Sequence, residues 1–176
     1  MEECEFTVSQ GRILGLVLDV SLRHQDDERI LDAVKTGLVQ FAKETLQSED
    51  IFYLYHAEII DTVEDLGEIV STIGNYETDG WNIDLRHALE QTFYVMSAED
   101  EDYERIFLYI TDRVQKNSDL KRTLTFEKRD QTGCNFLFFG IGNHYNKAAL
   151  SEMRANDCVT YVHLNSPQEL YSNLMG

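Results

Sequence analysis

Residues 13–19, Ile-Leu-Gly-Leu-Val-Leu-Asp, form the most hydrophobic strand-like segment of the chain, and this segment constrains the fold more than any other. A strand that is apolar on both faces is typical of the centre of a parallel sheet, because helices cover both faces of such a sheet. Asp19 closes the segment. Its carboxylate is therefore expected at the carboxyl edge of the sheet, where open α/β sheets place their ligands.

Strand-like and helix-like segments alternate along the rest of the chain. Further strands are predicted at 51–56, 58–63, 106–111, 135–141 and 159–164, and helices at about 26–46, 64–76, 84–96, 118–130, 146–156 and 167–174. Strands separated by helices of this length predict a parallel sheet with helices on both faces. Segment 58–63 is predicted to turn back on 51–56. No Pro-rich or Ser-rich linker interrupts the pattern, so we expect a lead-in at 1–11 and a single domain at 12–176.

The chain carries 32 Asp and Glu against 15 Lys and Arg, with a formal net charge of −17. This charge argues against direct nucleic-acid binding, because contacts to phosphate require a basic face. It argues equally against binding to an anionic membrane surface. It favours basic partners or divalent cations.

The amino terminus reads Met-Glu-Glu-Cys-Glu, without the basic and apolar segments of a signal peptide. No apolar run approaches the roughly 18 residues of a membrane span. Cys4, Cys134 and Cys158 include no CxxC pair, so we expect buried thiols in a reducing compartment. A cytoplasmic location is the expectation.

Two carboxylates occupy equivalent places on separate strands. Asp19 ends the first strand and is followed by Val20 and Ser21, and Asp112 ends the strand at 106–111. Between them, residues 80–89 read Gly-Trp-Asn-Ile-Asp-Leu-Arg-His-Ala-Leu and open a predicted helix. Because parallel strands end at one edge of the sheet, the two carboxylates are expected to lie near each other.

In these residues the chain resembles a von Willebrand factor A (integrin I-like) domain. That family reads Asp-x-Ser-x-Ser after its first strand, a Gly-x-Thr-like loop before a helix that contains Ala-Leu, and Thr-Asp-Gly after its fourth strand. The order and spacing fit from about residue 12 to the end, including Ser-Pro-Gln-Glu-Leu at 166–170. The resemblance implies a Rossmann-like three-layer α/β sandwich. Its six-stranded, mostly parallel sheet would have the order 3-2-1-4-5-6, one short antiparallel edge strand and helices on both faces.

The resemblance also implies a metal site. In that family five motif residues hold a divalent ion, usually magnesium, in the metal-ion-dependent adhesion site, and a carboxylate from a protein partner completes the shell. Magnesium suits such a site because it prefers hard oxygen ligands in octahedral geometry. Asp19, Ser21 and Asp112 match the motif in this chain.

The other motif positions depart from the family. Arg23 replaces the second serine and Arg113 replaces the glycine, while the threonine position falls on Ile83, or on Asn82 if the loop contains a gap. An isoleucine offers no ligand atom, and an arginine is a permanent cation that pairs with carboxylates in bidentate geometry. We therefore predict a degenerate site in which the Arg23 guanidinium, helped by Arg113 or Arg86, occupies or neutralises the pocket.

These features predict a non-enzymatic protein-protein interaction domain that binds through the loops at the carboxyl ends of the strands. Its partner would be a protein that is basic or that presents a carboxylate. The domain would bind no cofactor, or would bind Mg²⁺ weakly. The residues predicted to bind the partner or to neutralise the site are Arg23, Trp81, Asn82 and Arg113.

Three alternatives remain open. The first is Mg²⁺-dependent adhesion-type ligand binding through Asp19, Ser21 and Asp112. The second is a purely structural role, since Asp and Ser after a strand also cap helices and tie loops. The third is Mg²⁺-dependent phosphoryl transfer. It is disfavoured because a nucleophilic Asp19 would want an acid two residues on, where Ser21 stands, and because no glycine-rich phosphate loop follows the first strand.

Three loop features have a binding interpretation and a structural one. Trp81 is either an exposed interface anchor or a packed side chain, and the acidic residues 99–104 form either a docking patch for a basic partner or a solvated loop. Several histidines fall near the carboxyl ends of the strands, but no pair has the spacing of zinc ligands, so we expect no zinc site. They are His24, His56, His87 and His144.

Overall fold

The central sheet has six strands in the order β5-β4-β1-β6-β7-β8. The computed structural model describes residues 11–56, 59–78, 83–98, 103–113, 134–152 and 159–176. The strands are β1 (Arg12–Asp19), β4 (Ile51–His56), β5 (Ile59–Val63), β6 (Glu104–Thr111), β7 (Cys134–Ile141) and β8 (Val159–Leu164). All neighbouring strands pair in parallel except β4 and β5. The predicted strand order and the antiparallel edge strand are confirmed.

Strand β1 lies at the centre of the fold because both of its faces are apolar. Ile13 and Val17 belong to one buried cluster, and Leu14, Leu16 and Leu18 belong to a second cluster on the opposite face. The alternation follows from the two-residue period of a strand. Pairing with β4 on one side and with β6 on the other leaves β1 without a free edge.

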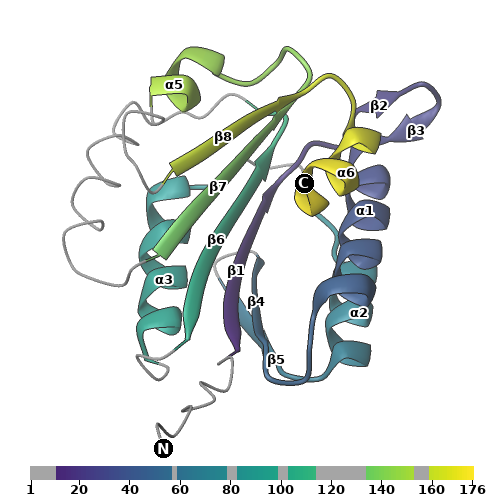
Figure 1. Ribbon diagram of the computed structural model, residues 1–176. Helices are drawn as coiled ribbons and strands as arrows, with labels where there is room; N and C mark the ends of the chain where they lie inside the picture. The colour runs from purple at the N-terminus through teal and green to yellow at the C-terminus, as the bar shows by residue number, and fades with distance from the viewer. Residues whose placement is uncertain (1–10, 57–58, 79–82, 99–102, 114–133, 153–158) are drawn as a thin grey trace, which may run out of the picture.

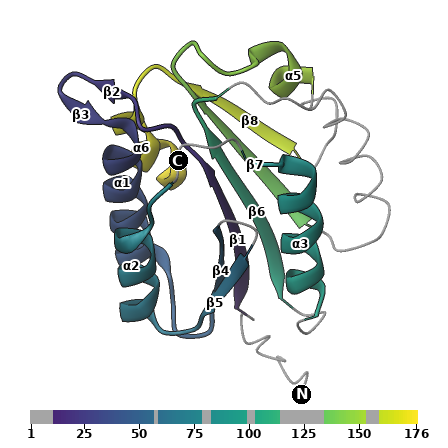
Figure 2. The same ribbon diagram turned by 180° about the vertical axis from the view of Figure 1, so that it is seen from behind.

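Helices cover both faces of the sheet (Figures 1 and 2). The helices α1 (Ile30–Thr45), α2 (Leu66–Asn75) and α6 (Leu170–Met175) cover one face, and α3 (Leu85–Ser97) and α5 (Lys147–Glu152) cover the other. Short polar side chains start two of them: Asp65 caps α2 and Asp84 caps α3. The 3-10 turn η2 (Pro167–Glu169) precedes α6, so Pro167 stands in a first turn as predicted. Of the helices described, none is both long and apolar enough to cross a membrane.

Gly15 allows α3 to pack closely on β1. A Cβ atom at this position would lie 2.4 Å from Cγ2 of Thr92 and 2.6 Å from Sδ of Met96, both on α3. Those distances are far inside van der Waals contact, so a side chain at position 15 would push the helix away from the sheet. The glycine in the first strand is therefore a packing requirement.

The segment between β1 and α1 differs from the prediction. The helix predicted from residue 26 begins at Ile30, and a hairpin precedes it, formed by β2 (His24–Gln25) and β3 (Glu28–Arg29). Asp26 and Asp27 at its tip have φ of 51° and 66°, the signature of a two-residue turn that Asp tolerates better than most residues. The Ile30 amide then donates to the Arg23 carbonyl at 2.9 Å and closes the loop. The helix predicted at 118–130 lies outside the described residues.

Candidate functional site

Asp19 lies at the carboxyl end of β1 and is almost completely enclosed, with 2% of its surface exposed. The Tyr109 hydroxyl donates to its Oδ2 at 2.8 Å. Burial raises the pKa of the Asp19 carboxyl, while the Tyr109 hydrogen bond and the Arg113 charge act in the opposite direction. Asp19 is therefore a buried acid whose charge depends on specific neighbours.

Asp112 and Ser21 are joined across 91 residues of sequence. The Ser21 amide donates to Asp112 Oδ1 at 2.7 Å, and the Ser21 hydroxyl donates to Asp112 Oδ2. Asp112 is itself 2% exposed. The structure thus brings the predicted residues Asp19, Ser21 and Asp112 to the same edge of the sheet. Each Asp112 oxygen accepts one hydrogen bond from Ser21 there.

The cation beside these acids is Arg113. Its side chain is buried, and its Nε lies 3.7 Å from Asp19 Oδ1. Its terminal nitrogen donates to the Val20 carbonyl at 2.8 Å and to Thr78 Oγ1 at 3.5 Å. Because it directly follows Asp112 at the end of β6, the guanidinium can turn back under the loop that follows β1.

The prediction that Arg23 would neutralise the carboxylates is corrected by this arrangement. The Arg23 side chain is exposed and makes no hydrogen bond or ion pair with any other described residue. The physical reason is the hairpin that follows it, which carries Arg23 to the rim of the loop face. The Arg86 guanidinium pairs with Glu90 instead, at 3.1 Å on the exposed side of α3.

The remaining predicted site residues divide into two groups. Ile83, on which the family's threonine position falls if the loop contains no gap, is half-buried and packs against the apolar cluster beneath α3. Trp81 and Asn82 lie outside the described residues, as do residues 99–102 of the acidic loop. Among the histidines, His87 is engaged by the Tyr55 hydroxyl, with 3.0 Å between Oη and Nδ1.

Leu22 is a site residue that the sequence patterns did not indicate. Its side chain is 42% exposed, and it stands between Ser21 and Arg23 on the loop face. An exposed leucine is unremarkable by itself. Its place beside the buried acids makes it a contact point for anything that covers this face.

A cavity of about 220 Å³ opens beside the acids, between the β2–β3 hairpin and the loops after β7 and β8. We call it the hairpin pocket. The polar side chains around it are Arg23, His24, Gln25, Asp112, Asn143, His144 and Asn165. His24 and His144 are two of the histidines expected near this edge of the sheet.

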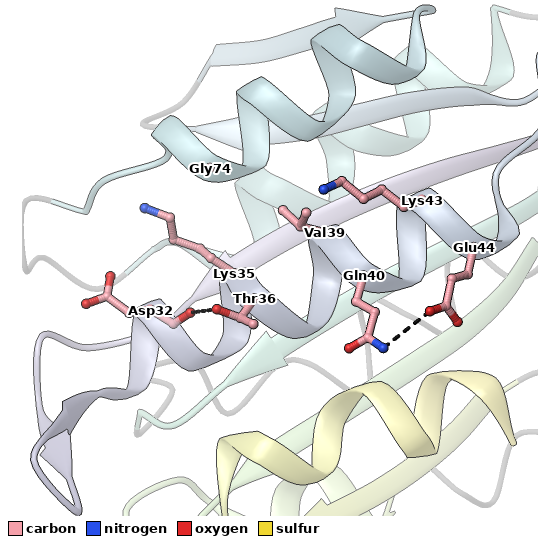
Figure 3. Close-up of a pocket in the computed structure, with 8 residues that line it drawn as sticks. All are labelled: Asp32, Lys35, Thr36, Val39, Gln40, Lys43, Glu44 and Gly74. Carbon is pink, nitrogen blue, oxygen red and sulfur yellow. Dashed lines mark hydrogen bonds between the residues drawn. The ribbon is translucent and has the colours of Figure 1, made fainter.

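A larger depression of about 590 Å³ follows the outer surface of α1 (Figure 3). Lys35 and Lys43 extend on the side of α1 that faces α2, and Gln40 and Glu44 extend on the opposite side. The charged groups are largely engaged within the chain: the Lys35 ammonium donates to the Tyr76 carbonyl at 2.7 Å, and Gln40 donates to Glu44 at 3.3 Å. This surface lies along the helix, away from the carboxyl ends of the strands, and is the weaker candidate.

The family of the chain follows from its sequence match. Residues 27–172 match the von Willebrand factor type A domain family, and the chain belongs to that family. No curated protein gives a significant match to the full chain.

Solved structures show the same fold at low sequence identity. A von Willebrand factor type A protein from Catenulispora acidiphila has a TM-score of 0.73 at 16% identity, with 93% of this chain and 41% of that chain covered. The conserved hypothetical protein BatB from Bacteroides thetaiotaomicron has a TM-score of 0.72 at 11% identity, with 93% and 95% covered.

Proximal thread matrix protein 1 from the mussel byssus has a TM-score of 0.67 at 18% identity, with 94% of this chain and 46% of that chain covered. This chain therefore spans less than half the length of the mussel and Catenulispora chains. At these sequence identities the likeness establishes the fold alone, and the function depends on the residues of the site.

Proposed function

We propose that this domain is a cytoplasmic protein-interaction module that binds its partner through the loops at the carboxyl ends of the strands, without a divalent ion. The observation that carries the proposal is the buried Arg113 guanidinium, 3.7 Å from Asp19 Oδ1, beside the residues that match the family's metal motif. A protein cation beside one of these motif carboxylates supports recognition that does not depend on a metal. Domains of this family typically act in protein interaction.

The contacts of the motif oxygens support the proposal that the site works without a divalent ion. Magnesium requires a near-octahedral shell of hard oxygens. Both Asp112 oxygens accept hydrogen bonds from Ser21, and Asp19 Oδ2 accepts one from Tyr109. The remaining oxygen, Asp19 Oδ1, faces the Arg113 guanidinium, which would repel a second cation at short range. Within the described residues, no group of three or more His, Cys, Asp or Glu side chains is placed to hold a metal.

The burial of Asp19 also supports a non-enzymatic role. A nucleophilic carboxylate must reach the atom that it attacks. Asp19 is 2% exposed, and both the Tyr109 hydroxyl and the Arg113 guanidinium hold it in place. This arrangement suits a residue that fixes two loops better than one that enters a phosphoryl-transfer reaction.

Capture of partners from an extract of the native source tests the proposal. Immobilised wild-type protein is compared with Leu22→Ser on the loop face and with Leu66→Ser as a matched control. Leu66 is 40% exposed, close to the 42% of Leu22, but it stands at the start of α2, at the opposite end of the sheet. Each capture is run with Mg²⁺ and with EDTA.

We expect the same partners with Mg²⁺ and with EDTA, their loss in Leu22→Ser and their retention in Leu66→Ser. Partners that disappear with EDTA and return with Mg²⁺ would establish metal-dependent adhesion instead. Equal capture by the two leucine variants would place the binding surface elsewhere on the domain.

A further inference from the structure

Tyr145 joins the segment after β7 to the edge strand β8 through its hydroxyl group. The hydroxyl oxygen lies 2.6 Å from His163 Nδ1, and it also makes a hydrogen bond with the Tyr161 hydroxyl. Tyr161 and His163 stand two residues apart on β8, so they share the face of the sheet that α3 and α5 cover. We call Tyr145, Tyr161 and His163 the β8 clasp.

Gly140 on β7 leaves the space that the Tyr145 ring fills. A Cβ atom at position 140 would overlap this ring, so the ring rests directly on the backbone of the strand. Tyr145 is buried, and Leu150 of α5 is buried on the same face. These two side chains anchor the short segment that carries α5 to the sheet, and the clasp fixes one of the two anchors.

The Tyr145 hydroxyl keeps its proton at neutral pH. Burial raises the pKa of Tyr145, and the hydrogen bond with Tyr161 acts in the same direction. Tyr145 can therefore donate to Nδ1 of a neutral His163, while Tyr161 donates to the Tyr145 oxygen. In this arrangement both hydroxyl protons have an acceptor, and it requires His163 to carry its own proton on Nε2.

A second proton on His163 is incompatible with that arrangement. The imidazolium has two N–H donors and no acceptor, so its Nδ1 can no longer accept the Tyr145 proton. Both tyrosine protons would have to turn, and the new charge would stand in a half-buried place. The clasp therefore favours the neutral imidazole.

The polar groups around His163, besides the two tyrosines, come from α5 and from the segment after β8. Burial lowers the pKa of His163, and the Lys147 ammonium of α5 acts in the same direction. Asn165 and Glu169 act against this shift and are outweighed. The folded chain thus binds this proton less readily than the unfolded chain. The stability linked to His163 is complete above the unfolded value of 6.5 and falls as the pH drops through it.

We propose that the β8 clasp is an acid-sensitive device, which holds the segment 143–152 on the sheet while His163 is neutral and loosens it when His163 takes up a proton. The segment carries Asn143 and His144, which line the hairpin pocket, so its loosening changes the loop face. The inference goes beyond the proposed function and does not rest on it, because the device acts within the chain.

¹H–¹⁵N NMR of the full chain from about pH 7.5 to about pH 5 tests the inference, because free histidine titrates within this range. The spectra follow the ring nitrogens of His163 and the hydrogen exchange of the Leu150 amide, corrected for the intrinsic effect of pH on exchange. The Leu150 amide donates to the Asn146 carbonyl at 3.2 Å and reports on α5.

Three variants separate the clasp from other titrating groups. Tyr145→Phe removes the hydroxyl and keeps the ring. His163→Asn keeps a neutral acceptor close to the place of Nδ1 but does not titrate. Tyr94→Phe is the matched control, since it removes the hydroxyl of a tyrosine on α3 that is 76% exposed.

In the wild type we expect His163 to carry its proton on Nε2 at neutral pH and to titrate with a pKa below 6.5. Protection of the Leu150 amide should fall about three- to tenfold across the titration. Tyr145→Phe should raise the pKa of His163 by about 0.5–1, because it removes a hydrogen bond to the neutral imidazole. His163→Asn should abolish the fall in protection, and Tyr94→Phe should behave as the wild type does.

A proton on Nδ1 of neutral His163, or an unchanged pKa of His163 in Tyr145→Phe, would overturn the inference. Protection of Leu150 that does not change with pH would overturn it as well. An equal fall in the wild type and in His163→Asn would assign the effect to other groups and would also contradict the clasp. None of these results bears on the capture experiment with Leu22→Ser and EDTA.

Discussion

Replacement of Arg113 by methionine removes the buried cation and keeps a flexible apolar side chain in its place. At the observed 3.7 Å, unit charges attract by about 4.5 kcal/mol at an effective dielectric constant of about 20. The change also removes the hydrogen bond to the Val20 carbonyl. Breaking one partner of a buried ion pair typically costs about 3–5 kcal/mol, and we expect Arg113→Met to lower the free energy of unfolding by that amount near pH 7.

The loss should depend on pH in a defined direction. Burial raises the pKa of Asp19 in the folded state, so the stability linked to this group is present below its unfolded pKa and falls as the pH rises through the folded value. Removal of Arg113 raises that pKa further and extends the fall toward neutral pH. At low pH Asp19 is protonated, and only about 1–2 kcal/mol should remain, from the lost hydrogen bond to Val20.

Urea unfolding followed by far-ultraviolet circular dichroism measures this effect across the pH range. Arg113→Lys retains a positive charge and serves as the control, with an expected loss of less than half that of Arg113→Met. The cycle of Asp19→Asn, Arg113→Met and the double variant should give a coupling energy of about 2–3 kcal/mol at pH 7. A coupling below about 0.5 kcal/mol, or a loss that does not change with pH, would refute the assignment of Arg113 as the cation that balances Asp19.

Three further predictions concern the loops and the sheet. Ser21→Ala removes the hydroxyl donor to Asp112 and should lower the free energy of urea unfolding by about 1–2 kcal/mol, and an unchanged value would argue against that hydrogen bond. Gly15→Ala places a Cβ 2.6 Å from the Met96 sulfur and should cost about 1–3 kcal/mol by overpacking, seen as a lower Tm in calorimetry. Asp27→Gly relieves a positive φ and should raise Tm, with a gain of about 1 kcal/mol, whereas a lower Tm would show that the Asp side chain stabilises the turn.

The parts of the fold that follow simple periodicity could be predicted from the sequence. Residues 13–19 are apolar at every position before Asp19, and that pattern is typical of a strand covered on both faces. The hairpin before α1 could not be predicted in this way. It depends on Asp26 and Asp27 adopting positive φ, and the apolar spacing that starts at Ile30 is the same whether or not the helix extends further back.

The candidate site shows a similar division. Because Asp19 and Asp112 both end parallel strands, their meeting at one edge follows from topology, and Ser21 follows from its place two residues beyond Asp19. The sequence spacing does not tell which arginine lies beside the buried carboxylates. Arg23 and Arg113 each stand within four residues of an acid in the sequence. In the structure, the β2–β3 hairpin places Arg23 at the surface, and Arg113 is the buried cation beside Asp19.

Calorimetric titration of the wild-type chain with Mg²⁺ and Mn²⁺ tests the central claim most directly, with Asp19→Ala as the comparison. If Arg113 supplies the charge that the family's metal would bring, neither ion should give saturable heat up to about 10 mM, well above the ~1 mM dissociation constants of weak protein cation sites. Saturable binding to the wild type that is absent in Asp19→Ala would contradict the account and restore a working metal site at Asp19, Ser21 and Asp112.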